Sequence, residues 1–495
     1  MPARKTSRGP VLQWVVVLVV GIIVVALVLG LNLIPRLQDG QDVLNAAKPA
    51  FTTQSLNTDA AGITIVSHDV SLANPIVTPA GGGAAEVPTV VKVVATMDHI
   101  SDAKALAALQ QQFPHTTKLL EAIPLSAVSA ELPKLETFLE STLKVTPAQL
   151  VTALKTSFPA IYQTIAYLPI VTNNWYHVPR LAADGLTDFN GAPVSTVPQL
   201  RDYFAHLIGV VKGQQSNFSS LDSTSVNWIP WVVLAIGIVV IVFSLLMIVL
   251  SRRGITRKIA VASASVVVLV GVVVVALVLA LNLIPRLNNG QKLLNALNPA
   301  FTVARVDGDR AGIDMVADIV NSENPIMTPS GGAAGEVPKL VAFVSAKTKL
   351  SKTQVLGALQ KNFPHTTAIL EAIPLTSVTA ELPAVLGALT PAAVPHIPEL
   401  AQTVLNAQPV TSGWNNVPGT AGATNFEGGP VNTAPEIATY FSHDVIPVLE
   451  TQRSHWATLT GTSKINFIGW LVLIIGVIAI VYGLLMVFLA RTRTA

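Results

Sequence analysis

The same two landmarks occur in both halves of the chain. The heptapeptide Leu-Asn-Leu-Ile-Pro-Arg-Leu at 31–37 returns at 281–287, and Phe-Pro-His-Thr-Thr at 113–117 returns at 363–367. Both landmarks are displaced by 250 residues, so the repeating unit spans about half of the 495-residue chain. Because a repeat of this length includes everything between its landmarks, the chain must use one architecture twice. The sequence therefore predicts a tandem duplication.

Four long stretches contain no Asp, Glu, Lys, Arg or His, namely 14–34, 228–250, 259–284 and 467–490. Each reaches the roughly 20 residues that a helix needs to cross about 30 Å of hydrocarbon. Buried helices of a soluble protein would give shorter runs with a polar stripe, and the chain would carry more than the 12% of charged residues found here. The third stretch matches the first and lies in mid-chain, where no signal peptide occurs. We therefore predict four retained transmembrane helices.

Lysine and arginine are distributed asymmetrically around these stretches. The short segments 1–13, 251–258 and 491–495 carry nine basic and no acidic residues, which is the bias of cytoplasmic loops. The long regions 35–227 and 285–466 hold the other 22 basic residues and all 28 acidic residues. We therefore expect a multi-pass protein of the plasma (inner) membrane, with both termini in the cytoplasm and both long regions outside it. Membrane topology and contact with anionic lipid account for the basic residues, so no nucleic-acid partner is expected.

The charge pattern predicts nine segments along the chain. They are a cytoplasmic N-terminus (1–13), transmembrane helix 1 (14–34), extracytoplasmic copy 1 (35–227), transmembrane helix 2 (228–250), a cytoplasmic loop (251–258), transmembrane helix 3 (259–284), extracytoplasmic copy 2 (285–466), transmembrane helix 4 (467–490) and a cytoplasmic C-terminus (491–495). The cytoplasmic segments are too short to form a folded domain, so the function must lie outside the cytoplasm or within the bilayer.

Both extracytoplasmic regions are predicted to be mostly helical. Proline stands where a helix would begin at Pro88, Pro147, Pro198, Pro338, Pro391 and Pro435. Ser351 and Gln354 have the spacing of a capping box. In copy 1, a pattern of helix, Phe-Pro and second helix at 103–124 recurs 45 residues later, which indicates stacked helical hairpins or a chance match of few positions. The predicted fold class is mainly α, with four transmembrane helices and two homologous, mostly helical extracytoplasmic domains.

Aromatic and histidine residues that recur in both copies are candidate interaction or ligand positions: His115 and His365, Trp175 and Trp414, Tyr203 and Tyr440, His206 and His443. No HExxH or other tight ligand spacing, no GxSxG elbow and no cysteine is present in the sequence. We therefore expect no catalytic, cofactor-binding or metal-binding residues, and histidines that form hydrogen bonds at helix boundaries. The alternative is an external enzyme that acts through the regions around His115 or His206.

Small residues recur in register within the second and fourth apolar stretches. Gly237 and Ser244 correspond to Gly476 and Gly483, and each pair is seven residues apart and so lies on one helix face. Small residues let helix backbones approach closely, whereas ion pathways need ionisable residues that these stretches lack. We expect these positions to pack helices of one chain together, or to pack two chains in a homo-oligomer.

These observations favour a binding or scaffolding role over a catalytic one. We expect a non-catalytic, membrane-anchored protein of the bacterial cell envelope whose extracytoplasmic domains bind a protein or another envelope component, with membrane lipid as a second partner and no cofactor. One alternative is an accessory or structural subunit of a membrane transport or export system, in which the halves form a pseudo-symmetric unit. Another is a sensor that lacks its own output domain.

Overall fold

The computed structural model describes residues 9–78, 82–223, 225, 227–253, 256–328, 332–388, 394–461 and 464–492. Within these ranges the chain is mainly helical and contains no strand, although isolated bridges join Thr187 to Pro193 and Thr424 to Pro430. The predicted mainly α class is therefore confirmed. Parts of the predicted cytoplasmic segments, residues 1–8, 254–255 and 493–495, lie outside the described residues.

The chain forms two compact units, and each contains segments from both halves of the sequence. Unit 1 comprises Met1–Thr52, Val210–Thr302 and Val448–Ala495, and unit 2 comprises Thr53–Gly209 and Val303–Pro447. These units do not follow the boundaries of the two long regions defined from the sequence. The ends of both regions belong to unit 1, and their middle parts combine in unit 2.

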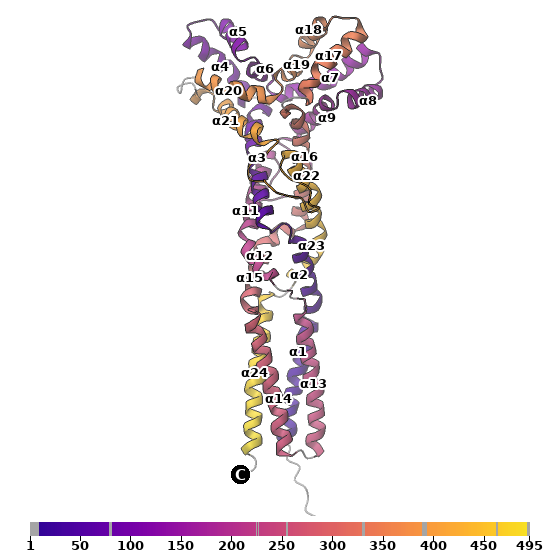
Figure 1. The fold of residues 1–495 in the computed structure, drawn as a ribbon, viewed down its shortest axis with the longest axis vertical. Coiled ribbons are helices and arrows are strands. Elements are labelled where there is room, and N and C mark those ends of the chain that lie inside the picture. Colours follow the sequence, from indigo (N-terminus) through magenta and orange to yellow (C-terminus); the bar gives the residue numbers. More distant parts are fainter. Residues whose placement is uncertain are drawn as a thin grey trace, which may run out of the picture. The chain divides into compact units, whose positions relative to one another are not determined.

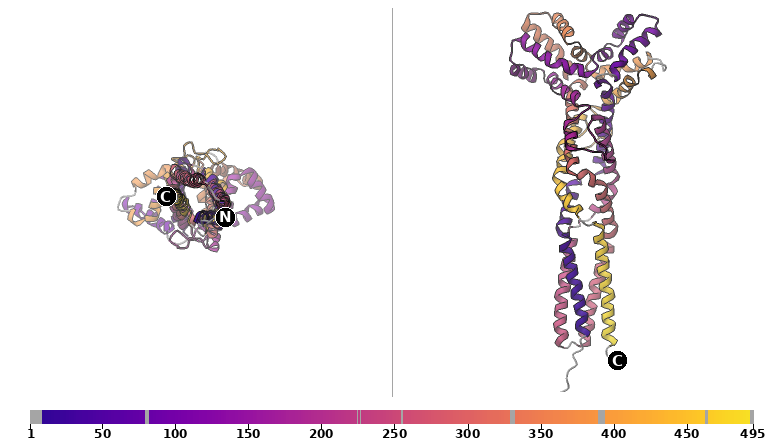
Figure 2. Two further views of the ribbon diagram at one scale, coloured as in Figure 1. Left: turned by 90° about the horizontal axis from the view of Figure 1, so that it is seen from below. Right: turned by 180° about the vertical axis from the view of Figure 1, so that it is seen from behind.

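Unit 1 contains four long apolar helices, namely α1 (Gly9–Gly30), α13 (Ile229–Arg253), α14 (Arg257–Ala280) and α24 (Asn466–Thr492). By length and composition, all four could cross a membrane. Only 17–28% of the residues in each apolar window are buried, so most of these side chains point away from the protein, as in a helix surrounded by lipid. Helix α1 packs along α13, and α14 packs along α24 (Figures 1 and 2).

A sharp break separates α1 and α14 from the helices that follow them. Asn32 and Asn282 adopt left-handed backbone conformations, with φ of 53° and 52°. Asparagine tolerates this conformation better than most other residues that carry a side chain. The chain then continues as α2 (Leu33–Ala47) in the first half and as α15 (Leu283–Leu297) in the second. The break accounts for the asparagine in both copies of the heptapeptide.

The arginine of each heptapeptide is buried and binds a helix end from the opposite half. Arg36 donates a hydrogen bond to the carbonyl oxygen of Leu459, 2.8 Å away, near the end of α23 (Ile446–Thr460). Arg286 donates to the carbonyl oxygen of Leu221, 2.9 Å away, near the end of α12 (Gln215–Asp222). The last carbonyls of a helix lack partners within it and carry partial negative charge, so a guanidinium satisfies them well. The repeated heptapeptide therefore joins the two halves.

Unit 2 is built from helices of both halves that pack on one another. The first half supplies α3 (Thr53–Val77), α4 (Gly82–Met97), α5 (Asp102–Gln112), α6 (Pro114–Ala122), α7 (Leu125–Leu143), α8 (Pro147–Ser157), α9 (Pro159–Asn174), α10 (Pro179–Asp184) and most of α11 (Val197–Gly213). The second half supplies α16 (Val303–Met327), α17 (Gly332–Thr348), α18 (Lys352–Asn362), α19 (Pro364–Ala372), α20 (Leu375–Ala388), α21 (Pro398–Gly413), α22 (Ala434–Tyr440) and the short helices η2 (Val394–His396) and η3 (Phe441–Val445). Helix α3 packs against α21, α9 against α16, and α6 against α19, so the halves share one hydrophobic core.

Four glutamates bind the N-termini of helices from the opposite half, and each lies in a Glu-x-Pro sequence: Glu86, Glu131, Glu336 and Glu381. The Glu381 carboxylate accepts hydrogen bonds of 3.2 and 2.8 Å from N–H groups in the first turn of α6. Glu131 accepts equivalent bonds of 3.3 and 2.7 Å from the first turn of α19. Glu86 binds the start of α21, and Glu336 binds the start of α9. A carboxylate stabilises a helix N-terminus because it satisfies free N–H groups and complements the helix dipole.

Not every proline marks a helix start. Helix α8 begins at Pro147, and α11 and α22 begin one residue before Pro198 and Pro435. The prediction is wrong for Pro88 and Pro338, which lie inside α4 and α17, while Pro391 lies outside the described residues. Both helices extend further because their first turns are packed: a Cβ on Gly83 would lie 3.0 Å from the Leu400 side chain, and Ala333 is fully buried. This packing outweighs the backbone cost of an internal proline.

Candidate functional site

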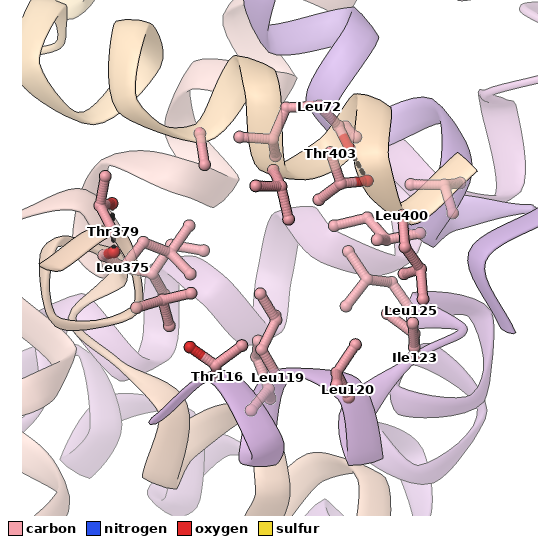
Figure 3. Close-up of a pocket in the computed structure, with 18 of the residues that line it drawn as sticks. Leu72, Thr116, Leu119, Leu120, Ile123, Leu125, Leu375, Thr379, Leu400 and Thr403 are labelled. Carbon is pink, nitrogen blue, oxygen red and sulfur yellow. Dashed lines mark hydrogen bonds between the residues drawn. The ribbon is translucent and has the colours of Figure 1, made fainter. Parts of the chain in front are cut away.

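An apolar cavity of about 110 Å³ lies inside unit 2. Helices α3, α4, α6, α7 and α9 from the first half and α16, α19, α20 and α21 from the second contribute to its wall. Figure 3 shows Leu72, Leu119, Leu120, Ile123 and Leu400 around the same space. A cavity with an aliphatic wall stays dry, because water inside it would lack hydrogen-bond partners, and it can therefore accept an apolar ligand.

Two polar atoms on the cavity wall are buried, Thr116 Oγ1 and Glu323 Oε2. Thr116 Oγ1 has no hydrogen-bond partner among the described residues, and the neighbour of the Glu323 carboxyl group is the carboxyl group of Asp69. The hydroxyl of Thr403, also on the wall, instead donates to the carbonyl oxygen of Leu72, 3.2 Å away (Figure 3). A buried polar atom without a partner costs about 1–3 kcal/mol. A ligand that offered a hydrogen bond to Thr116 or Glu323 would remove this cost.

Glu323 lies against a second carboxyl group, that of Asp69 on α3. Burial raises the pKa of Glu323 well above its usual value, and the charge of Asp69 raises it further. Burial also raises the pKa of Asp69, while a hydrogen bond from Glu323 opposes this rise. Two adjacent buried carboxylates repel each other, so the pair shares a proton near neutral pH, with Glu323 as the protonated member. The cavity wall thus carries a carboxyl group that is kept neutral.

Two of the candidate residues, Tyr203 and Tyr440, lie beside buried aspartates of the opposite half. Tyr203 is next to Asp309, and Tyr440 is next to Asp59, although neither pair has a well-aligned hydrogen bond. Burial raises the pKa of Asp59 to about 7, and the neighbouring tyrosine opposes the rise. Burial likewise raises the pKa of Asp309 to about 7, against the opposing effects of Tyr203 and the charge of Arg305. Burial also raises the pKa of both phenols, so they remain protonated.

His115 and His365 lie where α6 packs on α19, and each contacts a helix end of the opposite half. His115 Nδ1 is 3.2 Å from the carbonyl oxygen of Ala372, the last residue of α19. His365 Nδ1 is 3.0 Å from the carbonyl oxygen of Glu121, near the end of α6. A histidine in this position satisfies a carbonyl that has no partner within its own helix.

The other candidate residues occupy separate places in unit 2. The indole N–H of Trp175 donates to Asn74 at 3.0 Å, and that of Trp414 donates to Asn324 at 3.1 Å. Both rings are almost fully buried, and Trp175 also lies on the cavity wall. His206 and His443 are exposed on α11 and η3. The structure therefore brings only Trp175 of the eight candidates to the cavity.

The four small residues proposed at helix contacts are buried within the chain's own helix pairs: Gly237, Ser244, Gly476 and Gly483. Gly476 faces Gly271 on α14, where an added Cβ on Gly271 would lie 2.7 Å from the Gly476 carbonyl oxygen. Gly237 faces Gly21 on α1, and an added Cβ on Gly237 would lie 2.9 Å from the side chain of Val25. Close backbone approach of this kind requires glycine.

The cavity residues Thr116 and Glu323, and Asp69 beside Glu323, were not identified from the sequence. The position equivalent to Glu323 in the first half holds Ala73, and the position equivalent to Asp69 in the second holds Ile319, so the repeat gives no signal for either carboxyl group. By contrast, the pair Asp59 and Asp309 recurs at the common displacement of 250 residues and could have been found in that way.

Comparison of the chain with protein-family models, with curated proteins and with solved structures finds no match. The residues of the cavity are therefore the starting point for a functional proposal.

Proposed function

We propose that the protein is a non-catalytic, membrane-anchored binding protein of the bacterial cell envelope, and that unit 2 lies outside the cytoplasm and holds the aliphatic chain of a lipid. The four apolar helices of unit 1 support the membrane anchor. The lysine and arginine residues in the short flanking segments support cytoplasmic termini. The cavity is the single observation that carries the choice of ligand.

The size and chemistry of the cavity favour part of an aliphatic chain. Its volume of about 110 Å³ compares with the roughly 150 Å³ of an engineered apolar cavity that binds benzene, so it accommodates a segment of a chain and not a whole lipid. A flexible chain can follow the irregular surface between helices of two halves. Thr116 Oγ1 and Glu323 Oε2 favour a ligand whose chain carries a hydroxyl or carbonyl oxygen.

We also propose that the two halves arose by tandem duplication and now form one binding body. Equivalent residues make equivalent contacts at the common displacement of 250 residues, as in the pair Arg36 and Arg286 and the pair Glu131 and Glu381. In each case the contact joins one half to the other. A separated half would therefore lack helix-end partners for these groups and would expose its share of the core.

Photocrosslinking in native membranes tests the proposed ligand. A fatty acid with a diazirine near its methyl end is added to membranes that contain the full chain, and crosslinked peptides are identified by mass spectrometry. We expect crosslinks to cavity helices such as α6, α20 and α21, together with crosslinks to the four apolar helices, which serve as an internal standard. Crosslinks confined to the apolar helices would contradict the proposal.

A matched pair of variants separates the cavity from general lipid contact. Ala407 lies on the cavity wall in α21. Its equivalent in the first half is Leu168, because both Trp414 and Ala407 are 239 residues after their counterparts, Trp175 and Leu168. Ala407→Leu therefore fills the cavity with a residue that the related helix already carries, and it should abolish the crosslinks in unit 2 only. Ala107→Leu, at an exposed position on α5, is the control and should leave all crosslinks unchanged.

A further inference from the structure

Three potential metal ligands from two distant parts of the sequence meet in unit 1. Asp39 and Asp42 lie one turn apart on α2, and His455 lies on α23. His455 Nδ1 is 2.8 Å from Asp39 Oδ1, and one ligand atom from each of the three residues lies within 4.8 Å of the other two. The first half supplies both carboxylates and the second half supplies the imidazole.

We propose that Asp39, Asp42 and His455 bind a zinc ion. Zinc accepts imidazole nitrogen and carboxylate oxygen at about 2.0–2.2 Å, and ligand atoms around a tetrahedral ion with such bonds are roughly 3.4 Å apart. Rotation of exposed side chains can bring the three ligand atoms to this spacing, because Asp42 is exposed and the Asp39 and His455 side chains are 22% and 38% exposed. The same exposure leaves the fourth position to water.

The other half shows that the fold does not need these ligands. Phe51 stacks on Phe218 with ring centroids 4.2 Å apart, and Phe301 stacks on Trp456 at 4.1 Å, so Phe218 and Trp456 occupy equivalent places. The residue before each is Asn217 in the first half and His455 in the second. On α15, the residues equivalent to Asp39 and Asp42 are Asn289 and Lys292, by the displacement of 250 residues.

The equivalent place thus holds Asn217, Asn289 and Lys292, which cannot form such a ligand set. Asn217 donates a hydrogen bond to Gln214 at 2.8 Å, and Asn289 donates to Ser220 at 3.1 Å. Helix α15 nevertheless packs on α12. Packing alone therefore does not require two carboxylates and a histidine, whose joint occurrence at the α2 and α23 contact is explained by a cation.

The contact between α2 and α23 also includes an arginine of α2. Arg36, one turn before Asp39, directs its guanidinium to the carbonyl oxygen of Leu459. Because the ligands come from different halves, a bound zinc ion would hold α2 and α23 together. This role is independent of the lipid cavity, which belongs to unit 2.

Zinc binding by the full chain tests the proposal. The protein is purified in detergent with an affinity tag that contains no histidine, stripped with a chelator, and titrated calorimetrically with zinc chloride and, separately, manganese chloride. We expect one zinc ion per chain and weaker binding of manganese, since one ligand is an imidazole. Absence of zinc binding, or a preference for manganese, would overturn the assignment and leave Asp39 and His455 as an ion pair.

Variants that exchange residues between the two halves should remove the zinc site from its present place or create a second zinc site in the other half. The variant Asp39→Asn, Asp42→Lys, His455→Asn carries the residues of the other half and should lose the zinc ion while its circular dichroism spectrum is retained. The variant Asn289→Asp, Lys292→Asp, Asn217→His should bind a second zinc ion. Asp42→Asn, at an exposed position, is the mildest change and should weaken zinc binding by on the order of tenfold or more. Unchanged stoichiometry and affinity in these variants would show that zinc binds elsewhere.

Discussion

Arg36 and Arg286 make the same contact in the two halves of the chain, and so do Asp59 and Asp309 with their tyrosines. The carboxyl groups beside the cavity differ, because Glu323 has the counterpart Ala73. The ligands proposed for zinc differ in the same way. These shared arginines and aspartates thus contact the opposite half, whereas Glu323 and the proposed zinc ligands, which have no counterpart in the other half, lie at the two candidate ligand sites.

The repeated sequence thus contains two kinds of residue: those that form a contact in both halves, and those that form a ligand site in one place only. A contact between opposite halves occurs twice, and its loss in either place weakens the same shared core. A ligand site near the boundary between the halves needs to occur only once, so its residues are free to differ. The comparison predicts that shared residues affect stability in both halves, and that residues present in one half affect ligand binding with little effect on stability.

The largest expected effect concerns the shared aspartates. In the folded protein the pKa of each aspartate is about 7, whereas in the unfolded chain the pKa of aspartate is about 4. Between about pH 4 and pH 7 the folded state therefore binds more protons than the unfolded state. The free energy of unfolding should therefore fall as pH rises from about 4 to 7 and stay level above that. Asp59→Asn or Asp309→Asn should remove much of this fall and stabilise the protein at pH 8 by on the order of 2–4 kcal/mol.

Thermal unfolding of the full chain in detergent, followed by circular dichroism from pH 4 to 9, measures this effect. Similar gains for both variants at pH 8 would support the equivalence of the halves. A larger gain for Asp59→Asn would sharpen the comparison, because only Asp309 has the charge of Arg305 nearby. Wild-type stability that is constant or increases between pH 5 and 8 would refute the assignment of raised pKa values.

The shared arginines should have the next largest effect. Arg36→Met or Arg286→Met keeps most of the side-chain volume but removes the hydrogen bonds to buried carbonyl oxygens, at a cost of about 2–3 kcal/mol in each half. Arg180→Met is the control, because the Arg180 side chain is 72% exposed and its ion pair is weak. Chemical unfolding of the three variants measures the difference. If either buried arginine behaved like Arg180, the contact would not join the halves.

The close helix contacts allow a finer comparison. Gly271→Ala would place a Cβ 2.7 Å from the backbone oxygen of Gly476, whereas Gly21→Ala would meet first the side chain of Ile241 at 2.9 Å. A side chain can rotate and a helix backbone cannot, so we expect a loss of about 1–3 kcal/mol at Gly271 and a smaller loss at Gly21. Gly30→Ala, with nothing within 4 Å of the added atom, is the control in the same thermal unfolding assay. Equal losses at Gly21 and Gly271 would contradict the backbone contact.

Features set by neighbouring residues could be predicted from the sequence. Helix α5 ends at Gln112 and α6 begins at Pro114, as the Phe-Pro pattern predicts, and the same pattern separates α8 from α9. The capping box at Ser351 and Gln354 is also confirmed, with hydrogen bonds of 3.2 and 2.9 Å. These features depend on steric limits and hydrogen bonds within a few residues, so the local sequence is sufficient to define them.

Features set by the contact of the two halves could not be predicted. Glu381 and the first turn of α6, which it binds, are about 265 residues apart, and the cavity wall combines nine helices. A repeated sequence shows which segments are alike, but not whether a helix packs on its own half or on the other. The Glu-x-Pro pattern is visible in the sequence and also occurs at Glu323, yet its role at the other four glutamates depends on where the opposite helix begins.

Glu323→Ala should have the smallest effect on stability and a specific effect on binding. The first half already has alanine at the equivalent position, and the change removes a buried carboxyl group together with its repulsion of Asp69, so the free energy of unfolding should change by less than about 1 kcal/mol. The wild-type protein should bind a fatty acid with a mid-chain hydroxyl more tightly than the unsubstituted fatty acid, by about tenfold for one such hydrogen bond. In the variant this preference should disappear while the unsubstituted chain still binds. Competition of the two fatty acids against the diazirine probe measures the preference, and an unchanged ratio in Glu323→Ala would place the ligand oxygen away from this carboxyl group.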